Sequence, residues 1–184
     1  MHPIKHFITI TKHRHMVIKY CFKMGIGFQG LFHDLSKYSF AEFWSSAKYF
    51  TGKCSPNDIE RKEKGYSLAW MHHKGRNKHH FEYWVDLVDG VYAPVVIPIK
   101  YLKESLCDRI AASRIYLKKN YTDDAALNYF NRQNTMSKFH ILSAKTLYTW
   151  LVWVKDFGEK EAIKMIKNIK TYDDMEKYIE NEAR

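Results

Sequence analysis

Apolar residues recur at helical spacing along almost the whole chain. Ile10, Val17, Cys21 and Met24 fall on one side of a helix that we predict over about residues 4–24. Glycines, prolines and capping residues divide the rest of the chain into shorter segments. We expect further helices over about residues 39–50, 56–73, 78–91, 99–119 and 137–157, with short ones within 31–38, after residue 122, and from residues 159 and 173.

One stretch alone has the composition of a strand. Residues 91–100, VYAPVVIPIK, are rich in β-branched side chains but include two prolines, which favours a connecting segment over a central strand. Helix and strand do not alternate elsewhere, so the pattern predicts an all-α fold. The length of 184 residues is typical of one domain, and we expect a single helical domain over residues 1–184.

Basic residues and histidines gather in the first part of the chain. Residues 1–80 hold 14 Lys and Arg against 5 Asp and Glu, whereas residues 81–184 hold 16 against 15. Nearly all of the net charge of +10 therefore lies in the first part, together with every histidine except His140. This concentration favours a site for an anionic partner, with or without a metal, and a solvated basic surface is the alternative.

The cysteines and the N-terminal segment indicate a compartment. Cys21, Cys54 and Cys107 lie far apart and are odd in number, which is typical of reduced thiols. The first residues mix bases and histidines into their apolar positions, unlike a signal peptide, and no apolar run approaches the roughly 20 residues of a membrane helix. We expect a cytoplasmic protein that does not bind membranes.

Helical spacing separates inward-facing from outward-facing histidines. On the first helix, His13 lies on the apolar side and His15 lies nearly opposite. Further along, the spacing from the apolar positions favours the second histidine of each adjacent pair, and the first histidine stays open as the alternative. The spacing selects His73 over His72, and His80 over His79.

A further polar pair, His33-Asp34, is flanked by apolar residues. A single inward histidine is usually a hydrogen-bonded core residue, but several of them with an aspartate need a shared partner, because buried polar groups must be paired. A divalent metal ion supplies that partner. Imidazole and carboxylate ligands without a nearby cysteine are typical of manganese, iron, nickel, cobalt or zinc in a site that is not a structural zinc cage.

The segment GLFHDLSK, residues 30–37, resembles the signature of the His-Asp (HD) superfamily of metal-dependent phosphohydrolases. His13 matches, in order and in facing, an earlier histidine that members carry on the preceding helix. Asp108, in the segment CDRIAAS, matches the aspartate that ends their site on a later helix. The resemblance covers about residues 6–118 and implies an HD-like core there, with residues 122–184 as a helical C-terminal extension.

The resemblance implies a metal site whose ligands are His13, His33, Asp34 and Asp108. Members with two metals carry further histidines between the His-Asp pair and the last aspartate, and His73 and His80 would bind a second ion. The interval between these two histidines is shorter than in the well-studied two-metal groups. One ion and two ions therefore both stay open.

The activity implied by the resemblance is hydrolysis of a nucleotide or another phosphorylated small molecule by a metal-activated water. The enzyme would be a phosphomonoesterase or a phosphodiesterase, with Asp34 orienting the water and Lys37 reaching a phosphate oxygen. The loop around Gly75 offers further substrate-binding cations. These are Lys74, Arg76 and Lys78.

Three alternatives stay open. Some relatives of the HD fold use two irons to activate oxygen, which an aromatic-rich histidine site would suit. A catalytically inactive protein that binds nucleic acid would need basic residues and stacking aromatics on one exposed face, whereas most aromatics here fall on inner sides. The apolar segment 147–154 is expected in the core, with a homodimer seam as the alternative.

Overall fold

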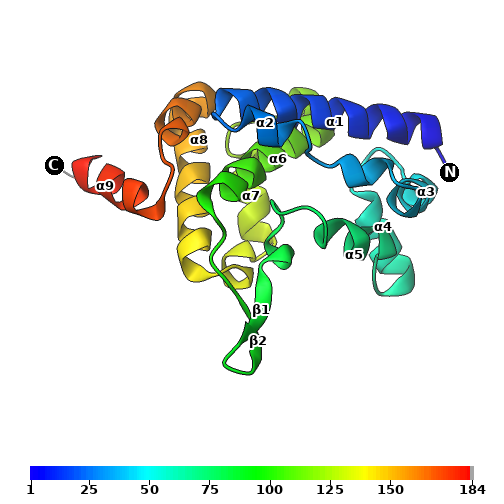
Figure 1. Cartoon of the computed structure of the whole chain (residues 1–184). Coiled ribbons are helices and arrows are strands. Elements are labelled where there is room, and N and C mark those ends of the chain that lie inside the picture. Colours follow the sequence, from blue (N-terminus) through cyan, green and yellow to red (C-terminus); the bar gives the residue numbers. More distant parts are fainter. Residues whose placement is uncertain (183–184) are drawn as a thin grey trace.

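The computed structural model describes residues 1–182, and its architecture is mainly helical (Figure 1). Along these residues, α-helices and short 3-10 helices (η) follow one another with a single small sheet between them, so the expected all-α class is confirmed. The elements are α1 Pro3–Lys23, α2 Gly27–Gly30, η1 Leu35–Tyr38, α3 Phe40–Tyr49, α4 Pro56–Lys64, α5 Leu68–Lys74, η2 Phe81–Tyr83, β1 Val85–Val88, β2 Val91–Pro94, α6 Ile99–Leu117, η3 Lys118–Asn120, α7 Ala125–Arg132, η4 Thr135–Lys138, α8 Ile141–Lys167 and α9 Tyr172–Glu182.

Several predicted helices form close to their expected ranges. Helices α1 and α6 match, and the apolar side of α1 is buried as expected. Helix α3 begins after Ser39, whose hydroxyl accepts a hydrogen bond from the backbone N–H of Glu42, as a capping residue does. None of the helices among residues 1–182 is long and apolar enough to cross a membrane.

The predicted helix over residues 56–73 divides into α4 and α5. Gly65 lies between them with a φ of 81°, a left-handed conformation that ends a helix and that glycine adopts without strain. On one continuous helix, the spacing of Ile59, Tyr66 and Trp70 predicts a shared buried side. The break at Gly65 makes this prediction wrong, and Tyr66 is exposed. The break leaves α5 as a short helix with His73 in its last turn.

The helix predicted over residues 78–91 is wrong. This segment forms η2 and then the antiparallel hairpin of β1 and β2, in which Val88 pairs with Val91. Asp89 and Gly90 at the turn both have positive φ values, the geometry that an Asp-Gly pair favours in a two-residue hairpin turn. The hairpin extends away from the helices (Figure 1), and Leu87 and Val91 are exposed rather than on an inner side.

Gly158 interrupts helical geometry at the position where a helix is expected to end. Helix α8 runs through this glycine to Lys167, but Gly158 itself has φ 75° and ψ 160°, outside helical geometry. Helix α8 therefore consists of two helices that meet at a kink, which confirms the predicted break between the segments over residues 137–157 and from residue 159. Its first half carries fully buried Leu147, Trp150, Leu151 and Val154, which confirms the expected core position of segment 147–154.

The main core is a cluster of buried apolar side chains from α1, α6, α7, α8 and α9. Helix α6 passes through the middle of the molecule, with α1 along one side and α8 on another (Figure 1). Buried Cys21 and Cys107 belong to this core as free thiols. Because α6 is packed on several sides, the polar residues that it carries are held rigidly in place.

Lys103 on α6 is a buried cation whose charge should make stability depend on pH. Its Nζ donates to the carbonyl of Lys167 at the end of α8, and burial lowers the pKa of Lys103 to about 8. The unfolded chain, with an ordinary lysine pKa near 10.4, binds the proton more tightly than the folded protein, so this cost is fully present below pH 8 and is lost as pH rises. We therefore expect the unfolding free energy of the wild type, relative to that of Lys103→Met, to rise by about 2 kcal/mol between pH 7 and pH 10.

Denaturant unfolding of both proteins at several pH values measures this difference. Lys100→Met, at an exposed position of the same helix, is the control and should show no such trend. A difference in unfolding free energy between the wild type and Lys103→Met that does not change with pH would contradict this prediction.

Glu159 joins α8 to α1, α6 and the segment after η3. One of its oxygens accepts from Arg114 Nε at 2.7 Å and from the Tyr121 hydroxyl at 2.6 Å, and the other accepts from the Tyr20 hydroxyl at 2.7 Å. Glu159→Gln replaces one accepting oxygen with an amide nitrogen, which donates, at a place where Arg114, Tyr121 and Tyr20 also donate. We expect the unfolding free energy to fall by about 2 kcal/mol in denaturant titrations, against no measurable change for Glu161→Gln at the exposed surface.

Candidate metal centre

Segments far apart in the sequence bring histidines and carboxylates to one buried place. His13 comes from α1, the His33-Asp34 pair from the turn between α2 and η1, His73 from the end of α5, and Asp108 from α6. His79 and His80 come from the segment that follows α5. The predicted inward position of His13 and the exposed position of His15 are both confirmed.

The turn that carries His33 and Asp34 is held tightly against α1. Gly30 precedes it, and a Cβ atom at this glycine would lie 2.4 Å from the Cβ of Cys21. Arg14 donates from its guanidinium to the carbonyls of Leu31 and His33, the latter at 3.1 Å. Asp34 itself has a φ of 54°, an uncommon conformation for a residue other than glycine, which the surrounding packing must maintain.

The first group of ligand atoms comprises His13, His33, Asp34 and Asp108. One potential ligand atom from each lies within 4.8 Å of the others. His13 Nε2 is 2.9 Å from Asp108 Oδ1, and His33 Nε2 is 3.2 Å from Asp34 Oδ2. The structure thus brings together all four residues that the HD resemblance assigned to one metal site.

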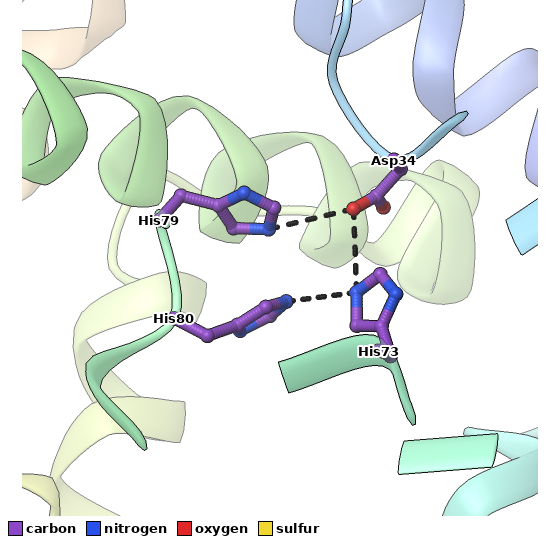
Figure 2. A group of neighbouring side chains, drawn as sticks. All are labelled: Asp34, His73, His79 and His80. Carbon is purple, nitrogen blue, oxygen red and sulfur yellow. Dashed lines mark hydrogen bonds and ion pairs between the residues drawn. The ribbon is translucent and has the colours of Figure 1, made fainter. Parts of the chain in front are cut away.

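The second group shares Asp34 with the first and adds three histidines, His73, His79 and His80 (Figure 2). Asp34 Oδ1 lies 3.3 Å from His73 Nε2 and 3.5 Å from His79 Nε2. His73 Nε2 and His80 Nε2 face each other at 2.9 Å. Nitrogens that bind one ion at about 2.1 Å lie about 3 Å apart when at right angles, so this spacing suits neighbouring ligands.

Buried ligand atoms in both groups lack a hydrogen-bond partner. Within residues 1–182 these atoms are Nε2 of His13, His33 and His79 and both carboxylate oxygens of Asp34. The imidazole nitrogens and carboxylate oxygens lie close together, but their directions do not meet the geometry of hydrogen bonds. Asp34 Oδ2 is partly compensated by the ion pair with Lys37, whereas leaving each of the other four unpaired costs about 1–3 kcal/mol, which a cation among them would offset. These buried clusters fit a divalent metal.

Glu104 on α6 lies on the Nδ1 side of two of these imidazoles, those of His33 and His79. Its Oε1 accepts from His33 Nδ1 at 2.8 Å and lies 3.2 Å from His79 Nδ1. An ionised carboxylate only accepts, so each Nδ1 carries a hydrogen, and a cation that displaces any proton from Nε2 would meet the Nε2 lone pair on the side toward Asp34. Gln29 donates to the other oxygen of Glu104 and so holds the carboxylate in place.

Glu42 on α3 orients the second group in the same way. Its two oxygens lie 2.9 Å from His73 Nδ1 and 2.5 Å from His72 Nδ1. His73 is buried and turns its Nε2 toward Asp34, whereas His72 is partly exposed and its ring nitrogen Nδ1 lies against Glu42. The predicted choice of His73 over His72 as the inward residue is therefore confirmed.

The charges of the site favour a cation. Burial would raise the pKa of Asp34, but the neighbouring His33, Lys37 and His73 lower it well below its usual range. Burial likewise opposes ionisation of Glu104, yet hydrogen bonds from His33 and His79 hold its pKa at about 2. Burial lowers the pKa of His33, but the Asp34 charge and hydrogen bonds outweigh it and raise this pKa well above its usual value. Ionised carboxylates therefore persist at neutral pH and attract positive charge.

Residues 2–151 of the chain match a family described as a family of unknown function, DUF5662. The chain belongs to this family. No match was found among curated proteins or among solved structures. The matched region of this DUF5662 protein contains every residue of the two ligand groups.

The remaining sequence-predicted residues occupy different places around the centre. Lys37, partly exposed, forms an ion pair with Asp34 Oδ2 and so belongs to the site. Among the described residues, Lys74, Arg76 and Lys78 make no hydrogen bond or ion pair with the ligand groups. Arg76 donates to the carbonyl of His72, and the Lys78 ammonium lies 5.6 Å from the Tyr101 ring centroid.

His79 enters the predicted site only as the open alternative to His80, and Glu104 and Glu42 are not predicted to belong to it. The preference for His80 depends on a helix over residues 78–91 that does not form, and in the turn that replaces its start both histidines reach the centre, with His79 the more deeply buried. The Glu104 position had a usable signal, because it lies one helical turn before Asp108 and so on the same side of α6. Glu42 follows Ser39 at the spacing of a capping box, which predicts a role in the helix cap, but its side chain contacts histidines.

Proposed function

We propose that this DUF5662 protein is a metal-dependent phosphohydrolase of the HD type that acts on a phosphorylated small molecule. The observation that supports it most is the convergence of unpaired buried ligand atoms on Asp34 from two directions. Two ligand groups that share one carboxylate suit a pair of adjacent divalent ions. The mixture of imidazole and carboxylate ligands without cysteine favours manganese, iron, nickel, cobalt or zinc.

His13, His33, Asp34 and Asp108 would hold one ion, and Asp34 with His73, His79 and His80 would hold the other. Bound ions of this kind lower the pKa of water and neutralise charge on phosphoryl oxygens. Glu104 and Glu42 fix the imidazole rings so that their Nε2 lone pairs stay directed inward.

Lys37 is placed to serve the substrate. Its ammonium lies beside Asp34 and 30% of its side chain is exposed, so a phosphate oxygen can reach it from solvent. A fixed cation at this place stabilises the negative charge that develops on the phosphoryl group. Lys74, Arg76 and Lys78 add positive charge near the second group and would attract an anionic substrate before it binds.

Elemental analysis together with a screen of phosphomonoesters and phosphodiesters tests the proposal. We expect bound transition metal and release of phosphate by the wild type, and loss of both in His33→Ala/Asp34→Ala, with the circular dichroism spectrum retained. Equal metal content in both proteins would contradict the site. Bound iron with oxygen consumption and no hydrolysis would replace the proposal by an oxygenase.

A further inference from the structure

A small cavity opens beside the second ligand group. It lies between α1, α3, α4 and α5, next to the end of α6, and its volume is about 70 Å³. Lys37 and His73 line it, and both also contact Asp34. A molecule whose phosphate reached the metal centre could therefore extend its other end into this cavity.

The size of the cavity limits what can enter. A cavity of about 150 Å³ takes up benzene, so about 70 Å³ accommodates a group of about three or four non-hydrogen atoms. Phe50, Ile10 and Pro56 form apolar parts of the wall and restrict its width. A nucleobase is larger than benzene and would not enter without displacement of helices.

The polar part of the wall offers mainly donors. Lys37 contributes a cation, Ser46 a hydroxyl, and Asn57 an amide whose nitrogen can donate; the Asn57 oxygen lies 3.4 Å from the Ser67 hydroxyl, which itself donates to Glu60 at 2.6 Å. Glu42 also lines the cavity, but its two oxygens lie against the rings of His72 and His73. A group that accepts hydrogen bonds is therefore favoured over a cation.

A buried polar atom in the wall still lacks a partner. His6 lines the cavity and is 4% exposed, and its Nδ1 has no hydrogen-bond partner among residues 1–182. A core position between Phe43 and Phe50 would ordinarily be filled by an apolar side chain. An imidazole placed there without a partner in the protein indicates that a polar ligand approaches it.

We propose that this cavity binds the non-phosphate end of the substrate, a short chain that carries a carboxylate or a hydroxyl group. The inference rests on the proposed function and narrows it from phosphorylated small molecules in general to compact, non-nucleotide ones. Specificity then arises from the size of the cavity and from the donors in its wall.

Calorimetric titration of the manganese-loaded protein tests the cavity with three phosphomonoesters. These are 2-phosphoglycolate, phosphoethanolamine and adenosine 5′-monophosphate. We expect 2-phosphoglycolate to bind at least about 10-fold more tightly than either of the others. Equal or tighter binding of the nucleotide would overturn the inference. The titration needs no turnover, so failure of all three to be hydrolysed would count against the proposed function alone.

Ser46→Leu fills the cavity from α3 and should weaken 2-phosphoglycolate binding at least about 10-fold, while metal content and affinity for inorganic phosphate stay unchanged. Ala41→Leu adds the same side chain at an exposed position of α3 and serves as the control. If Ser46→Leu does not fold, Ser46→Thr takes its place in the test. It adds a single methyl group and should also weaken 2-phosphoglycolate binding. Unchanged affinity for 2-phosphoglycolate in a folded Ser46 variant would overturn the inference.

Discussion

Asp34→Asn should abolish stoichiometric binding of metal and lower kcat/KM for phosphate release by at least about 1,000-fold. Asp34 is the residue common to both ligand groups, and within the described chain its buried Oδ1 has no hydrogen-bond partner while its Oδ2 has only the Lys37 ion pair and nearby imidazoles. Asparagine offers one neutral oxygen in place of two charged ones, which removes several kcal/mol of stabilisation from the centre. Elemental analysis and steady-state kinetics on the purified variant measure the two losses.

Asp89→Asn is a matched control for this change. Asp89 has a φ of 50°, close to the 54° of Asp34, but it lies exposed in the hairpin turn. Asparagine tolerates left-handed backbone geometry at both positions, so neither substitution should disturb the chain locally. Retention of full metal content by Asp34→Asn would show that the shared carboxylate is not a ligand.

The part of this centre that the sequence could predict is the part that local geometry determines. Helical spacing on α1 was enough to place His13 inward and His15 outward, because that helix is long and regular. The His33-Asp34 pair was found because adjacent polar residues within an apolar segment need a partner. Both inferences depend on neighbours in the sequence, and both are confirmed by burial.

The part that could not be predicted depends on irregular backbone and on packing between distant segments. The histidine pair at residues 79–80 lies in a turn between α5 and η2, where helical spacing does not apply. The Asp-Gly pair at the hairpin turn marked the true structure, and weighting it above the apolar spacing would have corrected that region. The contacts of Glu42 with His72 and His73 join α3 to α5, and nothing in either segment alone indicates them.

Glu104→Ala should weaken metal affinity by about 10- to 100-fold without removing a ligand. Glu104 accepts a hydrogen bond from His33 Nδ1 and lies close to His79 Nδ1, so it acts on one imidazole of each ligand group. Without it the rings can rotate and the Nδ1 hydrogens lose their acceptor. Competition titrations against a fluorescent chelator measure the apparent Kd of the metal.

Two further variants make this prediction specific. Glu104→Gln keeps an oxygen that can accept from an imidazole and should restore part of the affinity, which a general loss of packing would not show. Glu176→Ala removes a carboxylate from the exposed surface of α9 and should leave the affinity unchanged. An apparent Kd for Glu104→Ala within about threefold of the wild type would refute the positioning role.

Anomalous X-ray diffraction from crystals of the metal-loaded protein tests the central claim most directly. Data collected above and below the absorption edge of the bound metal locate the ion without reference to any assumed activity. We expect two anomalous peaks next to Asp34. One lies beside His13, His33 and Asp108, and the other lies beside His73 and His79. A peak located elsewhere in the molecule, with no density at Asp34, would contradict it.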